Sequence, residues 1–122
     1  MEEENFVDGP LSLRLFETDE VVCLEWRGQS MAREPARFLL PVLSKALDLG
    51  LQREKRLVID FQQLEDLNSS TITPVIRILE HARRGHSRVR ILYNKALKWQ
   101  ALSFTALELF RTADARIEVQ GV

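Results

Sequence analysis

The sequence predicts an α/β domain built on a mixed β-sheet that about three to four helices cover. Two observations indicate this class. Short β-branched and apolar runs alternate with longer stretches of helical spacing, in the order strand, strand, helix, strand, helix, strand, helix, strand. Strands that alternate with helices imply right-handed crossovers and a mostly parallel sheet, to which the two opening strands add an antiparallel hairpin.

The composition fits one domain. Of the 122 residues, 45% are hydrophobic and 29% charged, so the chain can bury a core without a disulfide or a metal. The 17 Lys and Arg against 18 Asp and Glu give a net charge of -1, which argues against non-specific attraction to nucleic acid or an anionic membrane. We expect an acidic N-terminal segment over residues 1–10 and a single domain over residues 11–122.

The opening hairpin follows from residue types. Leu11, Leu13 and Leu15 alternate with polar residues, and Val21 to Arg27 are β-branched and aromatic enough for a second strand after a short polar turn. Cys23, the single cysteine, lies within this apolar run, so we expect a buried and unreactive thiol.

No basic-then-apolar leader opens the chain and no apolar run approaches ~18 residues, so we expect a cytoplasmic protein.

The first helix is expected between Ser30 and Leu49, with Gly50 as its stop signal. Its apolar residues at helical spacing are Ala36, Leu39, Leu40, Leu43 and Leu47. Pro41 has no N–H and clashes with the preceding helical turn. Two alternatives stay open: the helix kinks at Pro41, or the main helix begins there.

The remaining elements are expected from the same patterns. Leu57 to Phe61 form a continuous apolar run, which is typical of a central strand covered on both faces. After it we expect a polar loop over residues 62–68, a helix from Ile72 to Ala82 that ends near Gly85, a strand over residues 89–93, a helix from Trp99 to Ala113 and a closing strand over residues 116–119.

Four consecutive residues, Asn68, Ser69, Ser70 and Thr71, stand before the second helix. Each type is a good N-cap, because its side-chain oxygen accepts a backbone N–H that has no partner inside the helix. One cap is enough, so capping alone explains the turn only in part. A helix N-terminus also accommodates phosphate, and a phosphate on a serine adds roughly -1.5 to -2 charge units. Simple capping and a phosphorylation switch are the two interpretations.

The segment from Leu57 to Leu79 resembles the central part of the STAS domain family, the fold of anti-sigma factor antagonists. Members show an apolar strand with Asp at its end, a short loop, and an Asp-Ser-Ser/Thr-Gly turn that opens a helix. Asp60 matches the strand-end Asp, and Ser69 corresponds to the serine that the family phosphorylates. Asn68 stands in place of Asp, and Thr71 in place of Gly, so positive φ is not expected at Thr71.

Two further motifs carry the resemblance. Leu67-Asn68-Ser69-Ser70, followed by Trp99-Gln100, is similar to a STAS-like subgroup of bacterial regulators best represented in cyanobacteria. A second STAS-like group, which regulates cyclic-di-nucleotide synthesis, also has Asn before its phosphorylated residue.

The resemblance implies a non-catalytic bacterial regulator switched by phosphorylation of Ser69, with Ser70 or Thr71 as alternatives. The residues expected to bind a partner are Asp60, Asp66, Asn68, Ser69, Ser70 and Thr71. The implied partners are a serine/threonine kinase of the anti-sigma type, a metal-dependent phosphatase and a downstream effector, with the chain a monomer or weak dimer. The alternatives are a constitutive interaction module without phosphorylation, or an activator of a signalling enzyme such as a diguanylate cyclase.

Other residue patterns favour no enzyme, metal or cofactor. His81 and His86, the two histidines, have no Cys or carboxylate at metal-ligand spacing, and no glycine-rich phosphate loop is present. A basic stretch holds Arg77, Arg83, Arg84, Arg88 and Arg90. It is interpreted as a solvated helix face and strand end, or as a contact for an acidic partner. It has no interleaved aromatic residues for stacking on nucleic acid.

Overall fold

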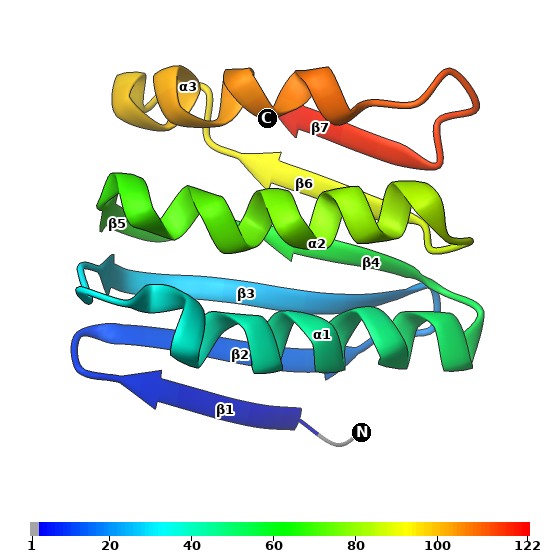
Figure 1. The fold of residues 1–122 in the computed structure, drawn as a ribbon, viewed down its shortest axis with the longest axis horizontal. Coiled ribbons are helices and arrows are strands. Elements are labelled where there is room, and N and C mark those ends of the chain that lie inside the picture. The colour runs from blue at the N-terminus through cyan, green and yellow to red at the C-terminus, as the bar shows by residue number, and fades with distance from the viewer. Residues whose placement is uncertain (1–2) are drawn as a thin grey trace.

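Seven strands form one mixed sheet in the order β1-β2-β3-β4-β6-β7, and β5 pairs with β3 (Figure 1). The computed structural model describes residues 3–122. The strands are β1 (Glu3–Asp8), β2 (Leu11–Glu17), β3 (Val21–Ser30), β4 (Arg56–Asp60), β5 (Leu64–Leu67), β6 (Val89–Tyr93) and β7 (Ile117–Gly121). The helices are α1 (Pro35–Arg53), α2 (Ile72–Arg84) and α3 (Lys98–Thr105), with short 3-10 helices η1 (Ser69–Thr71) and η2 (Ala106–Phe110). The predicted mixed sheet covered by about three to four helices is confirmed, with three α-helices.

All three α-helices lie on one face of the sheet (Figure 1). The strands β3, β4, β6 and β7 are parallel and follow one another in a single direction, so right-handed crossovers bring each connecting helix to the same side. The expectation that residues 57–61 are covered on both faces is therefore wrong. Val58, on the face without helices, is only 7% exposed because it lies in register between Cys23 and Arg90 of the neighbouring strands.

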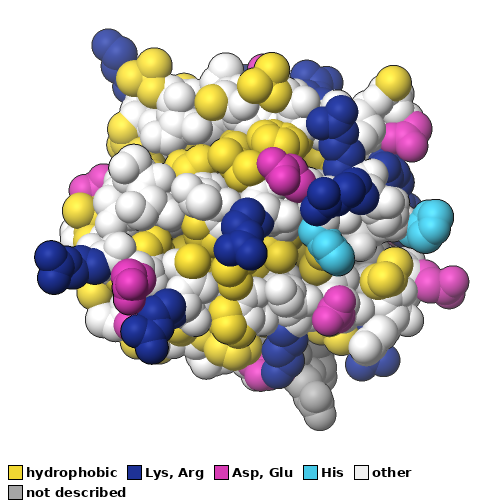
Figure 2. Space-filling view, in the orientation of Figure 1, with side chains coloured by type: hydrophobic (Ala, Val, Ile, Leu, Met, Phe, Trp, Pro, Cys, Tyr) yellow, Lys and Arg dark blue, Asp and Glu magenta, His cyan; other side chains and the backbone are white. Residues whose placement is uncertain are grey.

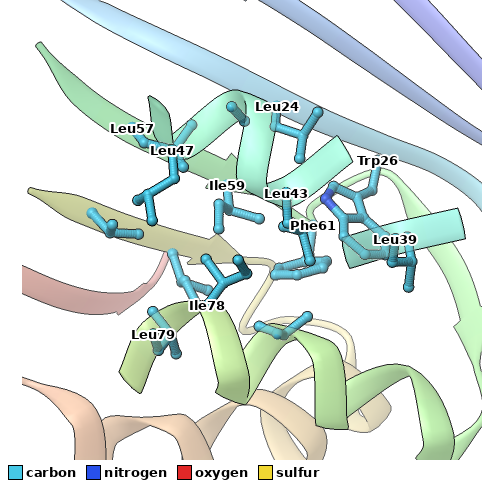
Figure 3. Close-up of a cluster of buried hydrophobic side chains, with 14 of the residues drawn as sticks. Leu24, Trp26, Leu39, Leu43, Leu47, Leu57, Ile59, Phe61, Ile78 and Leu79 are labelled. Carbon is cyan, nitrogen blue, oxygen red and sulfur yellow. The ribbon is translucent and has the colours of Figure 1, made fainter. Parts of the chain in front are cut away.

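The core lies between the sheet and the helices (Figure 3). Leu39, Leu43 and Leu47 recur every four residues and are buried along one side of α1. Trp26 of β3 and Phe61, the residue after β4, contribute large buried rings whose centroids are 4.7 Å apart. Burial of these side chains orients α1 and α2 on the sheet, and thereby places the start of α2 at one end of the strands.

The first helix differs from its expected bounds. It begins at Pro35, where a missing N–H is harmless, and runs past Gly50 to Arg53. Pro41 lies inside this single helix on its exposed side, where water can reach the carbonyl that loses its donor. Gly50 does not end the helix. It is buried, and a Cβ there would lie 3.1 Å from the Lys55 carbonyl oxygen, so the glycine permits a close approach.

Two strands were not expected. Residues 3–8 of the acidic segment form β1, which pairs antiparallel with β2, and residues 64–67 of the expected polar loop form β5. The third helix is also shorter than expected. It ends at Thr105 and continues as the 3-10 helix η2 to Phe110, so residues 111–113 lie outside it. Among residues 3–122, no helix is both long and apolar enough to cross a membrane.

Candidate functional site: the turn between β5 and α2

The position of the turn depends on the length of β3. This strand has two parallel partners in series, since β4 pairs with its first half and β5 with its last residues. The register shifts at Gly28, which has φ +86° and whose Cβ would lie 1.9 Å from the Pro10 carbonyl oxygen. Only glycine fits there. The end of β5, and the turn that follows it, therefore lie beside Ser30 at the end of β3.

Asn68 is the residue that anchors the turn. Its backbone N–H donates to the Ser30 carbonyl at 2.9 Å, and its side-chain Nδ2 donates to the Ala32 carbonyl at 2.8 Å. Its Oδ1 accepts the backbone N–H of Thr71 at 3.2 Å and so caps η1. The capping function predicted for the turn thus belongs to Asn68.

Thr71 lies inside the protein, with 0% exposure. Its hydroxyl donates to Asn68 Oδ1 at 2.8 Å, and its Oγ1 is 2.7 Å from the buried Ser30 Oγ. Its φ of -67° is negative, as predicted for a threonine in place of glycine. A kinase could not reach this hydroxyl without unfolding the turn, so we do not retain Thr71 as a candidate phosphorylation site.

The side chains of Ser69 and Ser70 take no part in holding the turn. Both are exposed, and neither side chain makes a hydrogen bond to any residue of the described range 3–122. Ser69 is the first residue of η1, which leads directly into α2. A phosphate on either hydroxyl would lie near the positive end of the helix dipole and would displace no existing side-chain contact.

The two aspartates of the predicted site lie apart from these serines. Asp60 ends β4 on the face of the sheet without helices, where its Oδ1 accepts the Gln62 N–H at 2.9 Å. Asp66 is exposed on β5, and its Oδ1 accepts the N–H of the next residue, Leu67, at 2.8 Å. Within residues 3–122, no hydrogen bond joins either aspartate to Ser69.

Gln100 is a further residue that positions this region. It is fully buried, and its Nε2 donates to the carbonyls of Phe61 at 2.8 Å and Leu64 at 3.0 Å. Its Oε1 accepts the backbone N–H of Asn94 at 2.8 Å. Gln100 therefore ties the segment after β6 to the segment that leads from β4 into β5. The Trp99-Gln100 pair marked this residue in the sequence, but its long-range partners could not be seen there.

Cys23 is buried, as predicted, and lies beside Val58 on the face of the sheet without helices. Burial raises the pKa of the Cys23 thiol to about 12, and the nearby carboxylates of Asp60 and Glu25 contribute in the same direction. The thiol is therefore protonated at neutral pH, and a protonated thiol is a poor nucleophile.

The basic stretch divides into three parts in the structure. Arg77, Arg83 and Arg84 are exposed on α2. Arg88 donates to the Glu54 carbonyl at 3.2 Å, and Arg90 forms an ion pair with Glu118 at 3.1 Å. The stretch is thus not one patch. His81 and His86 are exposed, and no group of three His, Cys, Asp or Glu side chains within residues 3–122 could hold a metal ion.

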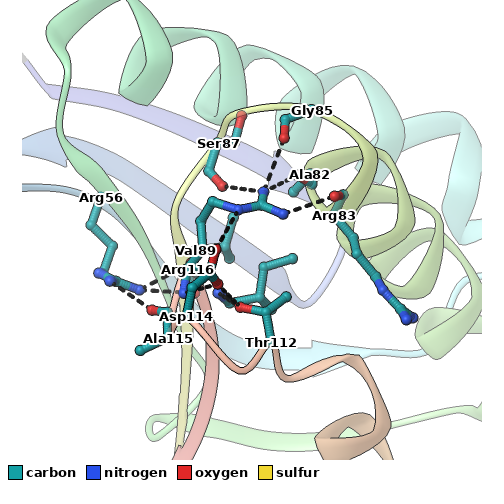
Figure 4. A network of polar contacts seen from close by, with 11 residues as sticks. Arg56, Ala82, Arg83, Gly85, Ser87, Val89, Thr112, Asp114, Ala115 and Arg116 are labelled. Atoms are coloured by element: carbon teal, nitrogen blue, oxygen red, sulfur yellow. Dashed lines mark hydrogen bonds and ion pairs between the residues drawn. The ribbon is translucent and has the colours of Figure 1, made fainter.

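The opposite end of α2 is held by Arg116 (Figure 4). Its Nη1 donates to the carbonyls of Ala82 at 2.7 Å, Gly85 at 3.1 Å and Ser87 at 3.2 Å, and its Nη2 to that of Arg83 at 2.9 Å. A guanidinium presents several donors in a fixed plane and suits this cluster of carbonyls better than an ammonium would. The charge also complements the negative end of the helix dipole.

Comparison with known proteins identifies the fold. No known family model matches the chain, and no curated protein matches its sequence. The chain is similar to the crystal structure of an uncharacterized protein of the DUF3478 family with a SpoIIAA-like fold, from Shewanella loihica PV-4. The TM-score is 0.56 at 16% identity, and the match covers 92% of this chain and 85% of the other. The chain thus has a SpoIIAA-like, STAS-like fold, while the subgroup with the Leu-Asn-Ser-Ser turn stays a prediction.

Proposed function

We propose that this chain, with its SpoIIAA-like fold, is a non-catalytic regulator that binds a partner protein at the turn before α2 and is switched by phosphorylation of Ser69. One observation carries the proposal. The turn contains two exposed hydroxyls, those of Ser69 and Ser70, which make no side-chain hydrogen bond within residues 3–122, whereas Asn68 already supplies the cap and the Thr71 hydroxyl is bonded to Asn68. Ser70 is the alternative acceptor.

The switch is electrostatic. In the unmodified protein, a partner packs against neutral hydroxyls at the tip of the turn. Phosphorylation places roughly -1.5 to -2 charge units on that surface, and the partner would have to desolvate this charge in order to stay bound. The fold is retained because the bonds that hold the turn, from Asn68 to Ser30, Ala32 and Thr71, do not involve the modified hydroxyl.

The partners follow from the resemblance to anti-sigma factor antagonists. A serine/threonine kinase of the anti-sigma type would transfer phosphate from ATP to Ser69, and a metal-dependent phosphatase would remove it. The unmodified protein would then bind the kinase or a downstream effector in a bacterial cytoplasm. Asp60 and Asp66, which lie apart from the two serines, are proposed as additional contacts for the partner.

Phosphorylation by candidate kinases tests the proposal. The full chain and two variants, Ser69→Ala and Ser70→Ala, are incubated with ATP and each anti-sigma-type kinase from the source genome, and the mass of the intact protein is recorded. We expect one added phosphate in the parent and in Ser70→Ala, and none in Ser69→Ala. Transfer lost only in Ser70→Ala would move the site by one residue. No transfer to any of the three proteins would leave a constitutive binding module instead.

Binding of the partner gives a second measurement. Ser69→Asp should lose affinity for the kinase or effector, whereas Ser69→Ala should bind it and resist modification. Thr73→Asp is the matched control, because Thr73 is exposed one helical turn further along α2. If both aspartate variants bind as the parent does, the turn is not the docking surface.

A further inference from the structure

The second half of the chain carries an excess of positive charge. Residues 71–122 contain nine Lys and Arg but four Asp and Glu, whereas residues 1–70 contain eight against fourteen. Of the nine cations, Arg90 and Arg116 form ion pairs with residues of the described range 3–122. The cations without such a pair are Arg77, Arg83, Arg84, Arg88, Lys95, Lys98 and Arg111. Such an excess attracts a partner of opposite charge.

A band of hydrophobic side chains runs between α2 and α3 on the helix-covered face (Figure 2). On α2, Ile72 and Ile76 are half-buried against the core, and Arg83 lies eleven residues after Ile72, about three turns further along the same side of the helix. Arg83 faces Phe110 of η2 across a hollow of about 410 Å³, whose other lining residues are Glu80 and Arg84. This side of α2 therefore faces α3 and η2.

The remaining hydrophobic side chains of the band come from α3 and η2. Trp99 and Phe110 are also eleven residues apart and half-buried. Leu102 and Leu109 stand on the outer side of the same segment and are 72% and 84% exposed. Large apolar side chains with that exposure, next to a half-buried band, are typical of a surface that binds another molecule. We call Ile72, Ile76, Trp99, Leu102, Leu109 and Phe110 the α2–α3 strip.

We propose that the α2–α3 strip is a docking surface for an acidic amphipathic helix of a partner protein. The strip lies along two neighbouring helices, so a third helix can lay its apolar face over it. At the η2 end, Arg83 and Arg84 line the hollow beside Phe110 together with Glu80, and the exposed Arg111 follows Phe110 in the chain. We infer that these cations select carboxylates on the incoming helix. No phosphate on Ser69 is required, so the surface is tested without a kinase.

A designed peptide tests the strip directly. The probe is a fluorescein-labelled peptide of about 14 residues, four helical turns, with Leu on one face and Glu on the other. Anisotropy during titration with the full chain should show saturable binding that weakens as salt is added. A peptide of the same composition with scrambled order, and one with Lys in place of Glu, should bind at least about tenfold more weakly.

Variants of the chain locate the bound peptide. The double charge reversal Arg83→Glu with Arg84→Glu should weaken binding roughly tenfold or more, whereas the same reversal at Arg33 and Arg37, exposed near the start of α1, should leave it unchanged. Leu109→Ser should weaken binding, and Leu51→Ser, at an exposed leucine of α1, should not.

Tryptophan emission adds a readout from the strip itself. Trp26 is fully buried, so a blue shift on binding reports the covering of Trp99, and Trp99→Phe should abolish it. Three results would overturn the proposal. The first is equal binding of the acidic and basic peptides, and the second is an equal loss of peptide affinity in the double variant at Arg83 and Arg84 and in the control pair. The third is binding to vesicles of phosphatidylcholine and phosphatidylglycerol but not to the peptide.

Discussion

At its amino end α2 follows a turn held by three uncharged side chains, whereas one guanidinium holds its carboxyl end. Asn68, Thr71 and Ser30 bond to one another and to the backbone, and they leave two hydroxyls free beside them. Arg116 binds four carbonyls at the other end. The contrast suggests that one end of the helix is a permanent anchor, while the other keeps exposed groups that can change without loss of the fold.

Removal of the anchor should have the largest effect on stability. Arg116→Ala removes the guanidinium bonds to the carbonyls of Ala82, Arg83 and Gly85 and should lower the free energy of unfolding by about 2–3 kcal/mol, measured by urea denaturation. Arg116→Lys should recover part of the loss, because an ammonium restores the charge but not the planar set of donors. Arg111→Ala, at an exposed arginine, is the control. A loss of the same size there would mean that charge alone matters.

Removal of the buried Thr71 hydroxyl should have the second-largest effect on stability. Thr71→Val keeps the shape of the side chain but removes the bonds to Asn68 Oδ1 and Ser30 Oγ, and should cost about 1–2 kcal/mol of unfolding free energy. The double variant with Ser30→Ala should cost less than the sum of the two single variants, since both remove the same contact. Additive losses would show that the two hydroxyls do not interact.

A lower pH should destabilise the carboxyl end of α2 more than its amino end. The Thr112 hydroxyl, and then the Arg116 backbone N–H, lower the pKa of Asp114 from 3.8, so the folded state favours its carboxylate. This contribution is complete above pH 3.8 and is lost as the pH falls through the lowered pKa. Because Asp114 also forms an ion pair with Arg116 at 3.6 Å, acidification should lower the hydrogen-exchange protection factor of Gly85 more than that of Thr71. Asp114→Asn should remove the difference, and equal responses at both ends would contradict it.

The exposed serines should have the smallest effect. Ser69→Ala and Ser70→Ala remove no hydrogen bond of the described residues, so each should change the unfolding free energy by less than about 0.5 kcal/mol. Thermal unfolding of each variant beside Thr71→Val checks this ranking within a single turn. A loss of 1 kcal/mol or more at Ser69, on the scale of about one hydrogen bond, would assign that hydroxyl to the fold.

Local patterns predicted most of the fold. The strand over residues 89–93, the antiparallel hairpin and the amphipathic face of α2 are all confirmed, because each buries one regularly spaced set of apolar side chains. The strand β1 was not expected because its acidic residues suit an exposed edge and conceal the pairing with β2. The strand β5 has four residues, two of them charged, and exists because the end of β3 offers it a partner.

The site was predictable in type but not in detail. The four capping residues marked the turn, yet the sequence could not show which of them caps the helix and which are free. That choice depends on Ser30, which lies 41 positions before Thr71 and meets it only through the sheet. Gln100 bonds to carbonyls 36 and 39 positions away, beyond the reach of any periodicity.

The shielded thiol of Cys23 makes the chain convenient for labelling. It is the single cysteine, and its pKa of about 12 keeps it protonated near neutral pH, where maleimides react with thiolates. A fluorophore or spin probe would then react almost exclusively with a second cysteine introduced at exposed Ser70, and Cys23 would not have to be replaced first. The turn and its partners could thus be followed in real time on a chain that differs at one position.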